Sequence, residues 1–237
     1  AVSLGLKQIA YKDLPEEKPG TWAYLDATPA SCVKYGLNVP FLEKFPDVVV
    51  SGINHGSNAA SAACYSGTLG AAEEAALNGI PAIGVSLDTI NPEADFSAVR
   101  KFFPDIFRKL MENMTSEPGI FYNVNFPNIP AEQIKGIRVG HQGMGRWIRE
   151  FREWDPSIYK KYGITPEDLG QSSSPKLESG EKLYMMVGDF LDDERNDSRA
   201  DHWIMNDGYI SIVPDNLDST DYEEVERLGK TGFDIDF

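Results

Sequence analysis

The segment that most constrains this 237-residue chain is residues 47–68, where a short apolar run leads into two loops of small residues. The run is three consecutive valines, residues 48–50, which is typical of a strand buried on both faces of a parallel sheet. In a sheet of this kind, ligands bind beyond the carboxyl ends of the strands. The loop at residues 51–58 is therefore expected to line a binding site.

The residues of these two loops suit a bound anion or cation. Gly52 and Gly56 allow the backbone to approach a ligand closely. Asn54 and Asn58 offer amide oxygens to a cation and amide N–H groups to an anion. The second loop ends at Ser66 and opens a helix, where unpaired backbone N–H groups and the helix dipole favour an anion. The layout therefore predicts an anion site.

The charge of the chain excludes several functions. Lys and Arg number 22 against 37 Asp and Glu, which gives a formal net charge of -15. Such a balance argues against non-specific binding of nucleic acid and against docking on an anionic membrane. A phosphate ligand therefore needs a metal cation or a ring of backbone N–H groups that overcomes the negative field of the protein.

The cysteines and the apolar runs indicate a reduced, cytoplasmic setting. Cys32 and Cys64 form no disulfide framework and lack the spacing of zinc ligands, and we expect both to be buried thiols. No apolar stretch reaches the roughly 20 residues that span a bilayer, and the first residues lack the features of a signal peptide. The chain begins with Ala rather than Met, which is consistent with the removal or omission of an upstream segment.

Strand and helix patterns alternate over residues 1–140, which we interpret as the core. Strands are expected at residues 4–12, 21–26, 48–50, 81–87, 121–126 and 136–139, and helices near residues 30–38, 66–77 and 96–110. Thr28 before Pro29 suits a helix N-cap followed by proline at the first helical position. Pro104 is expected to kink the third helix or to mark a fresh start. The alternation predicts an α/β fold with a doubly wound, mostly parallel, Rossmann-like sheet.

The character of the sequence changes after this core. Residues 141–205 are polar and show little helical periodicity, and we interpret them as an antiparallel hairpin arm that projects from the sheet. Residues 206–237 return as a strand at 208–213 and continue into a C-terminal helical extension. Thr220 and Glu223 form a capping-box pattern at the start of that helix. The predicted organisation is thus an α/β core, an arm and an extension.

Five segments of the chain resemble one known family in the same order and spacing. They are residues 26–38, 48–58, 65–87, 121–139 and 207–220. The second and third contain SGINHGSN and YSGT, and together they look like the signature region of the SurE family of stationary-phase survival proteins, which act as metal-dependent nucleotidases. The resemblance covers nearly the whole chain except residues 141–205, where it is weak.

This resemblance implies a phosphomonoesterase that hydrolyses nucleoside 5' or 3' monophosphates and, in some members, short polyphosphate. It implies one divalent cation per subunit, and an oxygen-rich ligand set suits Mg2+ or Mn2+. Asn54 matches a metal ligand of the family, while Asn58 and Ser66 match its catalytic, phosphate-binding positions. Gly67 and Thr68 would add backbone N–H groups to that phosphate site. Family members also form homodimers or homotetramers through such arms and extensions.

One part of the family pattern is missing from this sequence. The family holds its metal with two adjacent aspartates at the end of a first strand, and nothing before residue 26 resembles that strand. The family pattern leads us to expect about one further βαβ unit, on the order of 30 residues or more, before residue 1. The nucleotidase hypothesis therefore requires the Asp-Asp segment in the native chain. Asp192 and Asp193 are adjacent, but their charged neighbours indicate a solvated acidic loop instead.

Two other functions stay open at this point. The first is a non-catalytic nucleotide-binding or assembly protein of the same fold. The second is a Ser-His hydrolase with Ser66 as nucleophile, although the residues around it lack the G-x-S-x-G pattern. His55 is a candidate general acid or a plain polar contact, and we interpret His141 and His202 as structural. Four aromatic residues either stack a nucleobase or, as we favour, pack the arm or a subunit interface: Trp147, Phe151, Trp154 and Tyr159.

Overall fold

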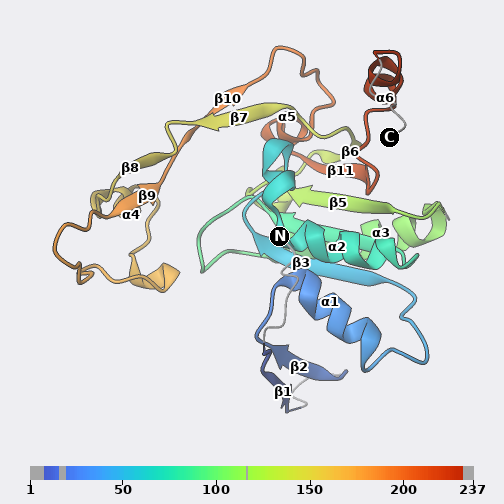
Figure 1. The fold of residues 1–237 in the computed structure, drawn as a ribbon, viewed down its shortest axis with the longest axis horizontal. Helices are drawn as coiled ribbons and strands as arrows, with labels where there is room; N and C mark the ends of the chain where they lie inside the picture. Colours follow the sequence, from blue (N-terminus) through green and yellow to red (C-terminus); the bar gives the residue numbers. More distant parts are fainter. Residues whose placement is uncertain (1–7, 16–19, 116, 232–237) are drawn as a thin grey trace.

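The computed structural model of the protein describes residues 8–15, 20–115 and 117–231. Its centre is a five-stranded sheet in the order β3-β4-β5-β11-β6 (Figure 1). The strands are β3 (Val49–His55), β4 (Ala82–Leu87), β5 (Ile120–Phe126), β6 (Gly136–Val139) and β11 (Tyr209–Asn216). Neighbouring strands run parallel except at the antiparallel pair of β5 and β11. The predicted α/β fold with a mostly parallel sheet is confirmed.

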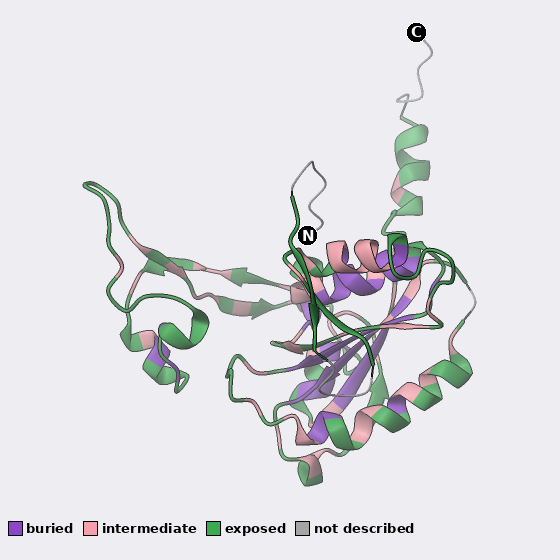
Figure 2. Cartoon of the chain, turned by 90° about the horizontal axis from the view of Figure 1, so that it is seen from below, coloured by how far each residue is buried: buried purple, intermediate pink, exposed green. Residues whose placement is uncertain are grey.

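Helices cover both faces of this sheet, so that the buried strands lie between two helical layers (Figure 2). The helices of the two layers are α1 (Pro29–Asn38), α2 (Gly67–Leu77) and α3 (Ser97–Asn113). One face of the central strands carries Ile83, Val85 and Val124, which form a core with α3. The opposite face carries Ala82 and Phe121, which pack against the alanine-rich side of α2. Burial on both faces explains why β4 is almost entirely apolar.

Local sequence signals explain the start of α1 and the continuity of α3. Thr28 caps α1 as predicted, because its Oγ1 accepts a hydrogen bond from the N–H of Ser31 at 3.3 Å. Pro104 lies inside α3, which continues through it as one helix, so the alternative of a fresh start at this proline is wrong. Val99 and Ile106 on either side of the proline are buried, and this packing outweighs one missing backbone hydrogen bond.

The first strand is shorter and later than the sequence predicts. β1 (Tyr11–Leu14) pairs antiparallel with β2 (Trp22–Leu25). The expectation of a strand over residues 4–12 is therefore wrong in its bounds, and residues 1–7 lie outside the described part of the chain. All four residues of β1 pair with the four residues of β2, so the partner strand limits the length of the hairpin.

The C-terminal helix begins one residue later than the capping-box pattern predicts. α6 (Tyr222–Gly229) is capped by Asp221, whose side chain accepts a hydrogen bond from the N–H of Glu224 at 3.0 Å. The expected cap at Thr220 is wrong because aspartate serves at least as well as threonine at this position. The helix extends away from the sheet (Figure 2), and Val225 on its apolar side is 55% exposed.

The expectation of two buried thiols is also wrong. Cys32 on α1 is partly buried, whereas Cys64 is exposed. Cys64 lies in η1 (Ala60–Tyr65), a short 3-10 helix between β3 and α2. The segment is rich in small residues, and Tyr65 beside the cysteine is 81% exposed, so this part of the loop faces solvent. Composition alone does not distinguish a buried loop of small residues from an exposed one.

Residues between β6 and β11 form an antiparallel arm that projects from one side of the sheet (Figure 1). Its elements are β7 (Gly145–Ile148), β8 (Phe151–Glu153), α4 (Ser157–Lys161), η3 (Glu167–Leu169), β9 (Tyr184–Met186) and β10 (Asp189–Asp192). β7 pairs with β10, and β8 pairs with β9. Beyond these strands, Trp154 donates to the hydroxyl of Tyr159 at 3.3 Å, and this hydroxyl donates to Gln171 at 2.6 Å. Trp154 and Tyr159 therefore help to pack the arm.

Helix α5 (Asp201–Asn206) brings the chain back from the arm to the sheet. It packs against β11, where Ile204 and Met205 are buried. A single 3-10 turn, η2 (Ala131–Gln133), precedes β6. Within the described ranges, none of the helices combines the length and the apolar character that crossing a bilayer requires.

Candidate functional site

The carboxyl end of β3 presents the proposed metal ligand. Asn54 is half-buried, and its Nδ2 donates to the backbone carbonyl of Gly56 at 2.8 Å, which leaves the amide oxygen available as an acceptor. The strand approaches β4 very closely at Gly52, where φ is +125° and an added Cβ would lie 2.3 Å from the carbonyl oxygen of Val85. Only glycine fits at this position, as the first loop glycine of the sequence suggested.

Asn58 lies in the loop after β3, where three buried side chains of β4 and β5 form hydrogen bonds with it. Its backbone N–H donates to Oδ1 of Asn125 at 2.8 Å, and its carbonyl accepts from Nδ2 of Asn123 at 3.0 Å. Its own Nδ2 donates to Oγ of Ser86 at 2.6 Å. Asn125 also donates to Asn123 at 2.8 Å, so the two asparagines of β5 support each other. Asn58 is only 4% exposed, and this loop position is therefore rigidly defined.

The start of α2 supplies the proposed anion site. Ser66 is the N-cap, and its Oγ accepts a hydrogen bond from the N–H of Leu69 at 3.0 Å. The carbonyl of Ser66 accepts from the N–H of Gly70 at 3.0 Å. The backbone N–H groups of Gly67 and Thr68 belong to the first turn, where a helix offers no internal acceptor. With the hydroxyl hydrogen of Ser66 they form three donors at the positive end of the helix dipole.

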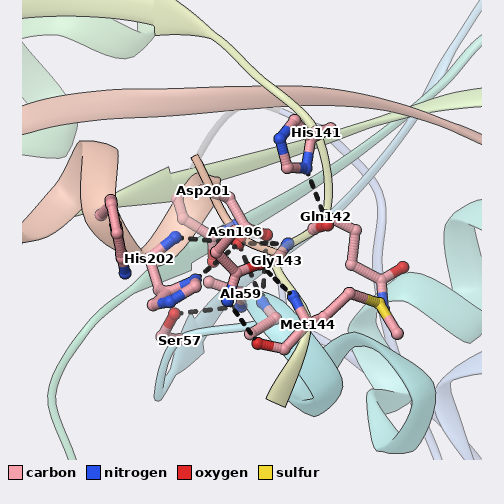
Figure 3. A network of polar contacts seen from close by, with 12 residues as sticks. Ser57, Ala59, His141, Gln142, Gly143, Met144, Asn196, Asp201 and His202 are labelled. Atoms are coloured by element: carbon pink, nitrogen blue, oxygen red, sulfur yellow. Dashed lines mark hydrogen bonds and ion pairs between the residues drawn. The ribbon is translucent and has the colours of Figure 1, made fainter. Parts of the chain in front are cut away.

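A buried carboxylate accepts hydrogen bonds from the segment between Asn58 and the start of α2. Asp201, the first residue of α5, is fully buried and accepts the N–H of Ala60 at 3.0 Å to Oδ1 and 3.1 Å to Oδ2. The same carboxylate accepts the N–H groups of Gly143 at 2.9 Å and His202 at 2.8 Å (Figure 3). Ala60 has a positive φ of 49°, a conformation that alanine adopts only when its surroundings hold it. Asp201 thus ties the loop after β3 to the base of the arm.

The adjacent aspartates of the arm are engaged in contacts of their own. Asp192 ends β10 and accepts from Trp203 Nε1 at 2.7 Å, which is the main cause of the lowered pKa of this carboxyl group. Asp193 forms an ion pair with Arg195 at 2.8 Å, which holds the pKa of Asp193 well below its usual range. Among the described residues, no group of three or more His, Cys, Asp or Glu side chains could hold a metal ion. The predicted acidic loop is therefore wrong for Asp192, which lies in β10 and contacts Trp203.

The three histidines lie apart from Ser66. His55 ends β3, is exposed, and packs against Phe96 with 5.0 Å between ring centroids and an interplanar angle of 44°. His141 contacts the carbonyl of Gln142 and the carboxylate of Asp197, and both contacts raise its pKa. His202 lies between two carboxylates, with Nε2 3.1 Å from Asp192. Within the described residues no histidine is hydrogen-bonded to Ser66, which argues against a Ser-His hydrolase.

A second acidic group lies on the sheet face that α2 covers. The pKa of Asp215 on β11 is raised to about 7, first by burial and then by the neighbouring carboxylates of Asp201 and Glu73. One of its oxygens, Oδ2, is buried without a hydrogen-bond partner among the described residues. Burial also raises the pKa of Glu73. Because a group with a pKa near 7 is partly protonated at neutral pH, the repulsion between these acids is reduced.

Comparison with known proteins identifies the family of this site. The family model described as Survival protein SurE matches residues 1–149. The chain belongs to the SurE family. The segment matched by this model includes β3 with Asn54, the following loop with Asn58, and the start of α2. The predicted membership in this family is thereby confirmed.

Individual SurE relatives match most of the chain. The protein named 5'-nucleotidase SurE from Cytophaga hutchinsonii is 37% identical over 214 residues, which cover 90% of this chain and 73% of the relative. The protein of the same name from Bacteroides fragilis is 33% identical over 227 residues, which cover 95% and 79%. The crystal structure of the SurE protein from Aquifex aeolicus superimposes with a TM-score of 0.72 at 27% identity, covering 98% of this chain and 82% of that one.

The structure of our chain shows four further residues near the candidate site that the sequence did not point to. They are Ser86, Asn123, Asn125 and Asp201, all fully buried. Ser86, Asn123 and Asn125 could have been recognised in the sequence, because a polar side chain inside an apolar strand must find a hydrogen-bond partner. Asp201 carried none, since it stands among other charged residues of a polar segment. The roles of Asn54, Asn58, Ser66, Gly67 and Thr68 stay predictions.

Proposed function

We propose that this SurE protein is a metal-dependent 5'-nucleotidase that hydrolyses nucleoside monophosphates. The observation that carries the proposal is the start of α2, where Ser66 caps the helix and Gly67 and Thr68 form its first residues. The hydroxyl of Ser66 and the N–H groups of Gly67 and Thr68 would bind an anion there. Asn54 near the end of β3 and Asn58 in the loop after it precede this helix in the chain. The relatives named 5'-nucleotidase SurE support the same activity.

The residues of the chain would bind and orient the phosphate. Because the Oγ of Ser66 accepts from the N–H of Leu69, its hydroxyl hydrogen is free to donate to a phosphate oxygen. The N–H groups of Gly67 and Thr68 would donate to the same group. Asn58 uses one hydrogen of its Nδ2 on Ser86 and would offer the second to the phosphate. Such fixed donors stabilise the charge of a phosphoryl group during attack by water.

Asn54 fits one ligand position for a divalent ion, Mg2+ or Mn2+, one per subunit. Its amide nitrogen is bound to the carbonyl of Gly56, so the oxygen is the atom that it offers. When bound, such an ion polarises a phosphate oxygen and lowers the pKa of a water molecule. The described residues bring no carboxylate cluster to this position. We therefore propose that an Asp-Asp pair of the native protein completes the site, as the family resemblance implies.

Phosphate release from a nucleoside 5'-monophosphate tests this function directly. We expect release with Mn2+, loss of activity after chelation, and recovery when excess Mn2+ is added back. The reason is that a dianionic substrate meets a protein with a net charge of -15, whose field a cation must offset. Parallel assays with a nucleoside 3'-monophosphate and tripolyphosphate test the wider substrate range that we propose. An equal rate before and after chelation would contradict the metal dependence.

A non-catalytic protein of the same fold is the second candidate. The observation that favours it is the lack of a metal-holding cluster within the described residues. In that case the protein binds a nucleoside monophosphate through Ser66 and its neighbours without releasing phosphate. Calorimetric binding of the nucleotide, combined with no turnover in the presence of Mn2+, distinguishes this function from the nucleotidase.

We also propose that the protein forms a homodimer or a homotetramer through its arm and α6. Large apolar side chains are exposed on both, including Phe151 at 71% and Met186 at 69% on the arm and Tyr222 at 67% on α6. Contiguous exposed apolar surface is typical of subunit interfaces. Light scattering is expected to give a mass of two or four chains. The mass of a single chain would contradict this proposal.

A further inference from the structure

We propose that Ser86 is a positioning residue of the phosphate site and that it acts through Asn58. The inference rests on the proposed function, because Asn58 is one of the residues to which we assign phosphate binding. Ser86 is fully buried in β4, where its neighbours in the strand are apolar residues or glycine. Its Oγ accepts the hydrogen bond from Nδ2 of Asn58 at 2.6 Å.

The backbone and the side chain of Asn58 are held by different residues. Asn123 and Asn125 hold its carbonyl and its N–H, so the loop stays in place without any contribution from Ser86. Ser86 alone holds the side-chain amide among the hydrogen bonds of Asn58 that the described residues make. Removal of the Ser86 hydroxyl is therefore expected to free the amide of Asn58 while the loop and the fold remain.

The orientation of this amide decides which of its atoms faces a ligand. The terminal torsion of asparagine is broad and roughly two-fold, so an unrestrained amide turns its oxygen as readily as its nitrogen toward the site. The hydrogen bond to Ser86 fixes the nitrogen on one side, and the planar amide then aims its second N–H in one direction. In the flipped orientation the amide oxygen would face the phosphate and repel it. Ser86 thereby restrains the amide torsion. Because its hydroxyl can also donate to an amide oxygen, the bound anion itself favours the orientation that presents an N–H group.

The chain offers a matched control for this residue in Ser211 on β11. Ser211 is also fully buried, and it lies opposite Asn125 in the register of β5 and β11, on the same face of the sheet. Its Oγ has no hydrogen-bond partner among the described residues. Ser86→Ala and Ser211→Ala remove the same atom from equally buried places. Only the first change removes a contact to Asn58.

The test compares the two variants with the wild type, all in the presence of Mn2+. Calorimetry measures the binding of inorganic phosphate, and initial rates give kcat and KM for a nucleoside 5'-monophosphate. For Ser86→Ala we expect the dissociation constant of phosphate to rise about tenfold, the factor that one lost hydrogen bond typically carries. A similar drop in kcat/KM is expected, with a thermal midpoint close to that of the control. For Ser211→Ala we expect phosphate binding and kcat/KM within about twofold of the wild type, since no partner is lost.

The outcomes separate this inference from the proposed function. If the wild type binds phosphate but hydrolyses no nucleotide, the nucleotidase proposal fails, while the binding data still test Ser86. Unchanged phosphate binding in Ser86→Ala would overturn the positioning role. Equal losses in the two variants would overturn it as well, because they would show a general effect of a missing buried hydroxyl. A wild-type protein that binds no phosphate would contradict both proposals.

Discussion

Replacing Asp201 with alanine is expected to lower the free energy of unfolding by about 4 kcal/mol, near the upper end of single-residue effects. The carboxylate is fully buried and accepts the backbone N–H groups of Ala60, Gly143 and His202. Each of these donors would be left without its acceptor, at a cost of about 1 to 3 kcal/mol for a buried group. Because the three donors come from the loop after β3, the arm and α5, the loss would loosen all three segments.

Urea unfolding monitored by circular dichroism measures this change in the unfolding free energy. Asp193→Ala is the matched control, since this carboxylate accepts from the side chain and the backbone N–H of Arg195, whose side chain is 73% exposed. A surface ion pair contributes about 1 kcal/mol or less, so the control should be nearly as stable as the wild type. An Asp201→Ala variant as stable as the control would show that the three donors find other partners.

The second large effect is expected at Asn54, where Asn54→Ala should reduce phosphate release by about 100-fold or more, as for the loss of one electrostatic stabiliser in an active site. The change removes the only metal ligand that we assign to the described residues. It also removes one hydrogen bond, from Nδ2 to the carbonyl of Gly56, which is worth about 1 kcal/mol of stability. Activity should therefore fall far more than stability.

Initial rates at saturating Mn2+, together with urea unfolding, measure both parts of this prediction. Asn113→Ala is the control, because Asn113 ends α3 and donates from Nδ2 to the carbonyl of Lys109 at 2.7 Å. It loses the same kind of bond far from the proposed site along the chain, and its activity should be unchanged. An Asn54→Ala enzyme with a rate within about threefold of the wild type would remove this residue from the metal site.

Several elements could be predicted from their own residues. The apolar run of β4 and the cap of α1 by Thr28 followed from local patterns, and the structure confirms both. The errors were also local in origin. At α6, Thr220 and Asp221 are both good caps, and the pattern could not choose between neighbours. At Pro104, packing of the apolar face of α3 against the sheet prevailed over the helix-breaking tendency of proline.

The candidate site also combines contacts between close neighbours in the chain with contacts between distant residues. Ser66 caps α2 through a residue three positions away, and the start of this helix followed from the local sequence. The contacts of Asn58 depend on Ser86, Asn125 and Asn123, which are 28, 67 and 65 residues away in the chain. No local pattern predicts such pairs, because they form only when the strand order places β3 beside β4 and β4 beside β5.

The sequence by itself determined the strand that ends in a glycine and asparagine loop, the capped helix that follows, and the family. These depend on backbone preferences and hydrogen bonds among close neighbours in the chain. Only the tertiary structure decided which buried polar groups meet. The bond from Ala60 to Asp201 spans 141 residues, and it exists because a buried N–H must find an acceptor wherever the fold brings one.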